Sequence, residues 1–348
     1  MDPRLKRLIQ GQGPLYVATF LFEHTGRYYG ARIEHACFQG LREGLEALGL
    51  HPEGPLTFLP YRDSNGVVVP QPGESLTQAI YRIDTERIRN SFALLAPIYH
   101  TQYDGGISFE VGYAAGIGLP VILLLSNYFQ YKHDHIAEPQ RLPPLLELLA
   151  DDVLCEGDFP FSGLDPDPQS YRELIEAAFE RIERRVREVV RELVLNYPGQ
   201  RVVPDPPARP GYAFLEFGGG EYEYQLIMAE RAQRELEALG WHVETARRYE
   251  ANSNDSLRLG AEQDFQNAVT SELIVTFGDG PDMNPESGAI QGYLRALGRK
   301  VVLYCSSTTR LYVGPEYDMR RNLMLTHSAD QVVLRLADLA SAVGSPAL

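Results

Sequence analysis

Residues 93–125 read ALLAPIYHTQYDGGISFEVGYAAGIGLPVILLL, and this stretch carries the clearest fold signal in the chain. It begins with the apolar run ALLAPIY at 93–99 and ends with the apolar run PVILLL at 120–125, and each run predicts a strand. A polar turn at 100–106 separates the first strand from a predicted helix at 107–118. Strands that are apolar throughout and alternate with helices are typical of a parallel sheet covered on both faces. The stretch therefore predicts an α/β fold.

The flanking segments continue this alternation. The run LYVATFLF at 15–22 is rich in β-branched and aromatic residues, which predicts a buried strand. Residues 27–48 and 76–91 predict helices, and residues 168–195 predict a long charged helix. Residues 50–75 contain many Pro, Gly, Asp and Asn residues, which indicates a loop.

The second half of the chain repeats the pattern of the first. We expect strands at 212–217, 273–277 and 300–305, with helices at 222–239 and 286–298. Several residues of the two halves match at one shared offset of 180 positions: Asp84 with Asp264, Ser91 with Ser271, Gly112 and Tyr113 with Gly292 and Tyr293, Gly118 with Gly298, and Val121 with Val301. This shared register predicts an internal duplication, and a fused pseudo-dimer is expected to have two-fold symmetry.

The best linker in the chain is the Pro- and Gly-rich segment YPGQRVVPDPPARPG at 197–211. We therefore expect a first domain over residues 1–196 and a second domain over residues 212–348. The two domains are expected to be tandem α/β units, each with a parallel sheet.

Composition argues against several classes of protein. The 348 residues carry a formal net charge of -15, which argues against binding to a nucleic-acid polymer because that is driven by Lys and Arg. The three cysteines, Cys37, Cys155 and Cys305, lie far apart without CxxC spacing, so neither a disulfide framework nor a zinc site is expected. The apolar runs are too short to span a membrane, and the N-terminus has no signal-peptide pattern. A cytoplasmic protein is the expectation.

Three carboxylates converge in the predicted fold. Asp104 follows a strand, Glu110 lies in the first turn of the next predicted helix, and Asp84 lies on the preceding helix, so all three face the carboxyl edge of the sheet. A helix N-terminus favours a negative charge, and we expect it to keep Glu110 ionised. Gly105 and Gly106 allow a ligand to approach the backbone closely. Carboxylates around one crevice suit glycosyl chemistry, although each residue alone is equally compatible with an ordinary turn or helix surface.

The segment Asp-x5-Glu-x-Gly-Tyr-Ala at 104–114, with an aspartate twenty positions upstream and a tyrosine in the first strand, resembles the nucleoside 2-deoxyribosyltransferases. The resemblance covers residues 14–126 and extends more weakly over 212–325. It implies a flavodoxin-like or Rossmann-like three-layer fold. It also implies transfer of 2-deoxyribose between nucleobases through a covalent intermediate, with retention at the anomeric carbon and without a metal or organic cofactor.

The resemblance also assigns roles to residues. The family nucleophile falls on Glu110, and the two aspartates that hold and protonate the base fall on Asp84 and Asp104. The first-strand tyrosine near the nucleophile falls on Tyr16, which is equally compatible with a core position. Related deoxynucleoside-monophosphate N-hydrolases usually carry a serine at the position of Asp104. An aspartate there would repel a 5′-phosphate, which favours a nucleoside with a free 5′-hydroxyl.

The second half departs from the family pattern. Ile290 stands at the position of Glu110 and Asn284 at that of Asp104, while Glu286 lies one turn before Ile290 and is only a weak substitute for the nucleophile. The second half does keep an Asn-Leu-Met segment at 322–324, which the family donates to a neighbouring subunit's pocket; residues 129–139 of the first half contain no such motif. We therefore expect one working site per chain, with Asn322 and Met324 contributed by a degenerate second half.

These observations predict a nucleotide-salvage enzyme that exchanges bases on 2′-deoxynucleosides. Its partners would be small-molecule nucleosides and nucleobases, and the pseudo-dimeric chains are expected to form a homo-oligomer. Two alternatives remain open at this point: a nucleoside or nucleotide N-glycoside hydrolase on the same fold, and a non-catalytic nucleotide-sensing module.

Overall fold

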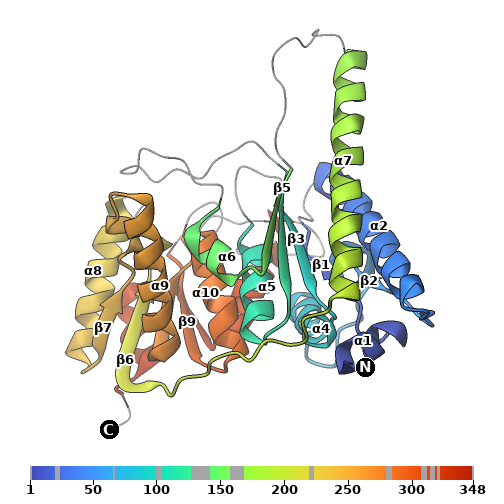
Figure 1. Cartoon of the computed structure of the whole chain (residues 1–348). Helices are drawn as coiled ribbons and strands as arrows, with labels where there is room; N and C mark the ends of the chain where they lie inside the picture. Colours follow the sequence, from blue (N-terminus) through green and yellow to red (C-terminus); the bar gives the residue numbers. More distant parts are fainter. Residues whose placement is uncertain are drawn as a thin grey trace.

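The structure is a computed structural model of the 348-residue chain. It describes residues 2–19, 24–65, 67–98, 104–126, 142–156, 168–218, 223–279, 284–306, 312–313, 318–319 and 322–346. The arrangement confirms the expected α/β fold, because two five-stranded parallel sheets lie side by side with helices packed on them (Figure 1).

The first sheet has the strand order β2-β1-β3-β4-β5, which is the flavodoxin-like order. Its strands are β1 (Leu15–Val17), β2 (Thr57–Phe58), β3 (Leu94–Ile98), β4 (Val121–Leu125) and β5 (Asp152–Cys155). The helices of this half are α1 (Pro3–Ile9), α2 (His24–Ala47), α3 (Pro60–Asp63), α4 (Leu76–Asn90), α5 (Gly105–Gly116), α6 (Pro144–Leu149) and α7 (Pro168–Leu195).

Alternate residues of each strand point to opposite faces of this sheet, as the pleat requires. Leu15 and Val17 pack with α2 and α7, whereas Tyr16 joins the core on the side of α4 and α5. That second core continues without interruption into the other half of the chain, so both halves share one apolar interior.

The second sheet has the order β7-β6-β8-β9-β12, which repeats the order of the first. Its strands are β6 (Arg209–Glu216), β7 (His242–Thr245), β8 (Ser271–Phe277), β9 (Lys300–Tyr304) and β12 (Gln331–Val333). The helices are α8 (Glu223–Ala238), α9 (Asn254–Thr270), α10 (Pro285–Ala296), α11 (Leu323–Ser328) and α12 (Leu339–Val343). Short elements complete this half: η2 (Arg248–Glu250), η3 (Leu336–Asp338), and the antiparallel pair β10 (Tyr312–Val313) and β11 (Asp318–Met319).

The registers of the two sheets also correspond. Leu94 pairs with Val121 in the first sheet, and Ile274 pairs with Val301 in the second. The four positions keep the 180-residue offset seen in the sequence. This correspondence supports the predicted duplication, which stays a prediction.

Helices α5 and α10 lie at the centre of the molecule and join the two halves (Figure 1). A Cβ atom placed on Gly112 would lie 1.9 Å from the carbonyl oxygen of Ala289, and one placed on Gly292 would lie 2.0 Å from that of Phe109. The two contacts are equivalent under exchange of the halves, as expected of a two-fold interface. Only glycine permits this close approach of the two backbones.

Several boundaries differ from expectation. The interval 50–75 contains β2 and α3, because two residues there add a strand to the sheet edge. Strand β1 is assigned only over Leu15–Val17, and the end of the expected strand lies outside the described residues. Strand β6 begins at Arg209, inside the segment expected to be the linker. The proposed domain limits therefore stay a prediction.

Candidate active site

Helix α4 places Asp84 on an apolar surface. The helix begins with a capping box, in which Ser75 accepts a hydrogen bond from the Gln78 backbone while the Gln78 side chain accepts one from the Ser75 backbone. Asp84 lies one turn from both Ile80 and Ile88 on the buried side of this helix, and only 3% of its surface is exposed. A buried carboxyl among apolar residues is costly, so Asp84 is not a solvated surface residue and remains a candidate for function.

Helix α5 begins two residues earlier than the sequence indicated. Asp104 is its N-cap, and the Asp104 Oδ1 atom accepts a hydrogen bond of 2.8 Å from the backbone N–H of Ile107. Glu110 therefore lies in the second turn of α5 and not in the first, at a position that is 94% buried. At that depth in the helix the positive end of the dipole has little effect on the Glu110 carboxyl.

Strand β1 supplies the partner of Glu110. The Tyr16 ring stacks on Phe58 of β2 with a centroid distance of 5.3 Å. Its hydroxyl donates a hydrogen bond of 2.7 Å to Oε1 of Glu110. Tyr16 is thus both a core residue and a polar contact of the expected nucleophile, which reconciles the two interpretations of this residue.

Burial dominates the protonation of these carboxyl groups. It raises the pKa of Asp84 to about 7, against a weaker opposing hydrogen bond from Ser64. Burial also raises the pKa of Glu110 well above its usual range, the neighbouring Asp84 and Asp104 raise it further, and the Tyr16 hydrogen bond opposes them. Burial and the neighbouring carboxyl groups thus oppose the ionised state of Glu110 that was expected from a helix N-terminus.

The second half of the chain reaches this same place through α11. Asn322 is the N-cap of α11 and accepts a hydrogen bond of 3.0 Å from the backbone N–H of Met324. A Cβ atom placed on Gly106 would lie 2.4 Å from the Asn322 amide nitrogen, so Gly106 is needed for Asn322 to approach α5. Arg321, which precedes this segment, lies outside the described residues.

One cavity of about 40 Å³ brings these groups together. It is lined by Thr19, Pro60, Asn65, Ile80, Asp84, Asp104, Gly106, Ile107, Glu110, Asn322, Leu323 and Met324. Seven residues of that set come from the segment 104–114 and from the Asn-Leu-Met segment at 322–324, which lie far apart in the sequence. Two of the expected site residues do not line the cavity. Tyr16 reaches the site through its hydrogen bond to Glu110, and the carbonyl oxygen of Gly105 packs against Gly288 of α10.

Two polar atoms at this cavity lack partners. Within the described part of the chain, Thr19 Oγ1 and Asp84 Oδ1 are buried and have no hydrogen-bond partner. Buried polar atoms are nearly always paired, so these two atoms indicate a site built for a polar ligand. The sequence analysis did not identify Thr19, Pro60 or Asn65, because Thr19 looked like part of a strand and the others lay in an expected loop.

The corresponding place in the second half is closed by a buried ion cluster. Arg248 is fully buried, and its guanidinium contacts Glu216 at 2.9 Å, Asp264 at 3.1 Å and Glu286 at 2.9 Å. Glu286 also accepts a hydrogen bond of 2.9 Å from the backbone N–H of Leu145. Glu286 is therefore committed to structural contacts, and the idea that it substitutes for the nucleophile has no support.

The two halves exchange equivalent helices. Asn322 begins α11, which packs on α4 and α5, and Pro143 begins α6, which packs on α9 and α10. By its place at the start of α6, the segment 143–145 corresponds to the Asn-Leu-Met segment at the start of α11. The stretch 129–139, where the sequence placed this counterpart, lies outside the described residues. Proline replaces asparagine at this position, so the second half receives no equivalent amide.

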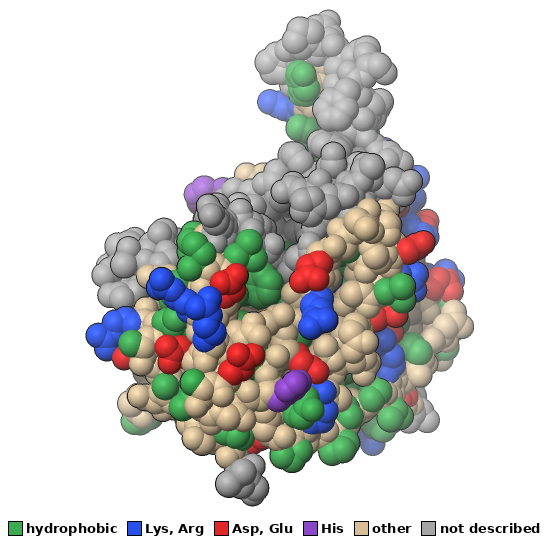
Figure 2. Space-filling view, turned by 90° about the vertical axis from the view of Figure 1, so that its left-hand side faces the viewer, with side chains coloured by type: hydrophobic (Ala, Val, Ile, Leu, Met, Phe, Trp, Pro, Cys, Tyr) green, Lys and Arg blue, Asp and Glu red, His purple; other side chains and the backbone are tan. Residues whose placement is uncertain are grey.

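Three further features bear on the expected partners. Among the helices that the structure describes, none is both long and apolar enough to cross a membrane. In the same residues, no group of three or more His, Cys, Asp or Glu is placed to hold a metal ion. On the face formed by the second half, basic and acidic side chains are interspersed rather than gathered by sign (Figure 2).

Comparison with known proteins finds a family model that is similar to the first half of the chain. The family model described as nucleoside 2-deoxyribosyltransferase matches residues 15–161. No curated protein matches the chain. Among solved structures, the chain is similar to a 2-desoxiribosyltransferase from Leishmania mexicana with a TM-score of 0.32 and 11% identity, over 38% of this chain and 96% of that one. Over residues 15–161, the chain is therefore similar to the nucleoside 2-deoxyribosyltransferase family.

Proposed function

We propose that the chain transfers 2-deoxyribose from one nucleobase to another at the site formed by Asp84, Asp104 and Glu110. The observation that carries this proposal is the convergence on one cavity of three carboxyl groups, one of them with an unpaired buried oxygen, and the unpaired Thr19 hydroxyl. The family match over residues 15–161 supports the same reaction.

In the proposed reaction, the Glu110 carboxylate attacks the anomeric carbon of a 2′-deoxynucleoside. A C–O bond to Glu110 forms, the glycosidic C–N bond breaks, and Asp104 gives a proton to the leaving base. A second base then attacks the anomeric carbon, Glu110 leaves, and the proton of the incoming base returns to Asp104. Two displacements retain the anomeric configuration.

Protonation sets a condition on the first step. Because the pKa of Glu110 is raised, this carboxyl has to lose its proton before it attacks. The hydroxyl of Tyr16 stabilises the ionised form through its hydrogen bond to Oε1. Burial and the neighbouring carboxylates raise the pKa of Tyr16 well above its usual range, so this hydroxyl stays a donor at neutral pH.

Each chain is proposed to have one working site made by both halves. Asn322 and Met324 line the cavity that contains Glu110, whereas the equivalent region of the second half holds Ile290 and the Arg248 ion cluster. A nucleoside is larger than the roughly 40 Å³ cavity, so the proposed substrate requires this cavity to widen. A cytoplasmic location, the absence of a cofactor and a homo-oligomeric state stay predictions.

The decisive experiment incubates the protein with a deoxynucleoside, with and without a second free base, and separates the products by chromatography. A new nucleoside supports transfer, free deoxyribose alone supports the hydrolase alternative, and no turnover supports the sensing alternative. Glu110→Ala is expected to lower the rate by several orders of magnitude. The control Glu188→Gln changes a carboxylate that is 55% exposed and should keep full activity.

A second measurement addresses the covalent step. Intact mass of the wild type with a deoxynucleoside is expected to reveal a deoxyribosyl adduct that Glu110→Ala lacks. Asp104→Asn keeps a good N-cap for α5 but removes the proton donor, so it should slow substrates with poor leaving bases most. Equal slowing of all substrates would contradict proton donation by Asp104, and activity of Glu110→Ala within about tenfold of wild type would refute the nucleophile.

A further inference from the structure

A larger cavity lies between the two halves, away from the carboxylate site. Its volume is about 410 Å³, and it is bounded by α5, α6, α9, α10 and the segment 201–204. The lining residues are Ala115, Leu148, Leu149, Arg201, Val202, Val203, Pro204, Glu262, Phe265, Gln266 and Tyr293. This volume lies within the range of pockets that bind small organic ligands. We call it the interdomain groove.

The pseudo-two-fold arrangement explains why the groove is open. On the opposite side of the α5–α10 pair, the equivalent helix positions are occupied by Tyr81, Arg295 and His327. The Tyr81 side chain hydrogen-bonds Arg295, and its ring lies 6.1 Å from that of His327. The helix alignment places Ala261, Ala115 and Leu148 at the positions of these three residues. Ala261 and Ala115 are smaller than Tyr81 and Arg295, which leaves room for the groove.

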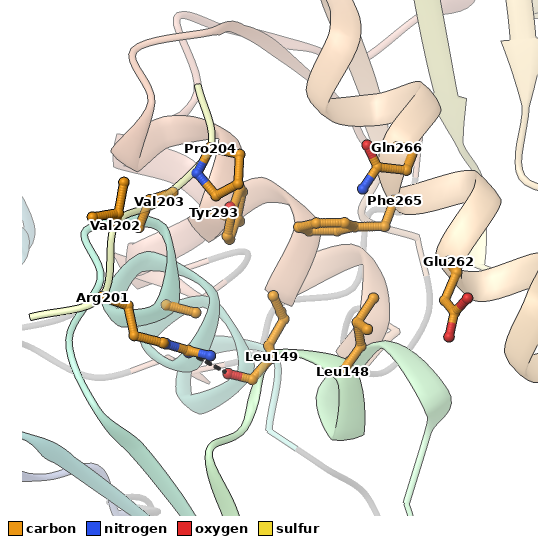
Figure 3. A pocket seen from close by; sticks show the side chains of 11 residues that line it. Leu148, Leu149, Arg201, Val202, Val203, Pro204, Glu262, Phe265, Gln266 and Tyr293 are labelled. Carbon is orange, nitrogen blue, oxygen red and sulfur yellow. Dashed lines mark hydrogen bonds between the residues drawn. The ribbon is translucent and has the colours of Figure 1, made fainter. Parts of the chain in front are cut away.

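Residues 201–204 of the linker form one wall of this space. Figure 3 shows Phe265 projecting from α9 toward Pro204 and Tyr293, with Leu148 and Leu149 below them. The rings of Phe265 and Tyr293 meet edge to face at a centroid distance of 4.8 Å. Aromatic rings and flat apolar side chains favour a planar ligand.

The polar groups of the groove favour a neutral ligand with hydrogen-bonding edges. Arg201 is paired with Asp151 at 3.2 Å, and Glu262 with Arg258 at 3.4 Å, so neither lining charge needs a counter-ion from a ligand. The Gln266 side chain lines the groove beside Phe265 and is exposed, and its amide makes no protein hydrogen bond within the described residues (Figure 3). An amide presents a donor and an acceptor together, which complements the edge of a base such as adenine.

We propose that the interdomain groove is a second, non-catalytic binding site for a neutral planar nitrogen heterocycle of the nucleobase class. The ring lies between Phe265 and the Val203–Pro204 wall, and the Gln266 amide pairs with its donor–acceptor edge. This site contains none of the carboxylates assigned to catalysis, and its existence does not depend on the proposed reaction.

Isothermal titration calorimetry with adenine as the probe tests this site. Gln266→Ala is expected to weaken binding in the groove about tenfold by removing the paired hydrogen bonds. Leu148→Trp fills the groove from a side chain that is 39% exposed, and it should abolish one binding event. Gln263→Ala alters an exposed amide on the same helix that does not line the groove, and it serves as the matched control.

The outcomes separate this proposal from the proposed function. If the catalytic site also binds adenine, the wild type takes two equivalents and Leu148→Trp takes one. If it does not, the wild type takes one equivalent and Leu148→Trp takes none. Unchanged stoichiometry in Leu148→Trp together with unchanged affinity in Gln266→Ala would overturn the groove site. Crystals soaked in adenine with a base bound only elsewhere would do the same.

Discussion

The buried guanidinium of Arg248 offers a sharp test of how the second half is held together. Its Nη1 and Nη2 atoms each donate a 2.9 Å hydrogen bond to Glu216, and Nε donates one of 2.9 Å to Glu286. Asp264 completes the cluster, and the three carboxylate side chains are at most 1% exposed. Arg248→Met keeps much of the apolar stem but leaves three buried carboxyl groups without their cation.

The expected loss follows from this geometry. Removing one partner of a buried ion pair costs about 3–5 kcal/mol, because the remaining charge is buried without compensation. The three pairs share one cation, so their contributions do not add, and protonation of the carboxyls limits the loss. We therefore expect Arg248→Met to lower the free energy of unfolding by about 3–5 kcal/mol at pH 7. This is a large part of the roughly 5–15 kcal/mol that stabilises a typical protein.

Urea denaturation followed by circular dichroism measures this loss. The control Arg258→Met removes a guanidinium that is 80% exposed and paired with Glu262 one turn away, so it should cost less than about 1 kcal/mol. Burial raises the pKa of Asp264, and Arg248 is the main group that opposes this. Without Arg248 the pKa rises further, so the deficit of the variant should shrink as the pH falls toward 4. A deficit no larger than that of the control, or one that grows on acidification, would refute the reasoning.

Three other changes test the interface and the candidate site. Gly112→Val is expected to destabilise the protein by several kcal/mol, because even a Cβ atom would lie 1.9 Å from the Ala289 carbonyl oxygen; thermal unfolding measures this, and an unchanged midpoint would contradict the α5–α10 packing. Asp84→Asn should become more stable relative to wild type as the pH rises from about 4 to about 7. Burial raises the pKa of Asp84 to about 7, so the neutral carboxyl of the wild type contributes its full stability below the unfolded-state pKa. This contribution is lost as the pH rises through the folded-state pKa, whereas the asparagine does not titrate. Equal pH profiles of unfolding would argue against this. Asn322→Ala should lower the rate of base exchange at least tenfold while costing about 1 kcal/mol of stability through the lost helix cap, and full activity would remove the second half from the site.

Local patterns were sufficient for most of the fold. The apolar runs at 93–99 and 120–125 predicted β3 and β4, because a strand buried on both faces needs apolar residues throughout. Strand β2 was not predicted, since its two residues form a strand only by pairing with β1. The start of α5 was misplaced because Asp104 resembled part of a turn, whereas its side chain caps the helix.

The sequence by itself determined the α/β class, the 180-residue correspondence between the halves and the family pattern around Glu110, because each of these depends on residues close together or in register along the chain. Only the tertiary structure showed that Asn322 lies beside Gly106 and that Arg248 occupies the region of the second half equivalent to the carboxylate site. It also showed the interdomain groove, where Ala115 stands at the position equivalent to Arg295. The protonation of Glu110 was also decided by the tertiary structure. The position of a residue in a helix indicates how strongly the helix dipole acts on it. Burial depends on contacts from both halves of the chain, and it is burial that raises the pKa of the Glu110 carboxyl.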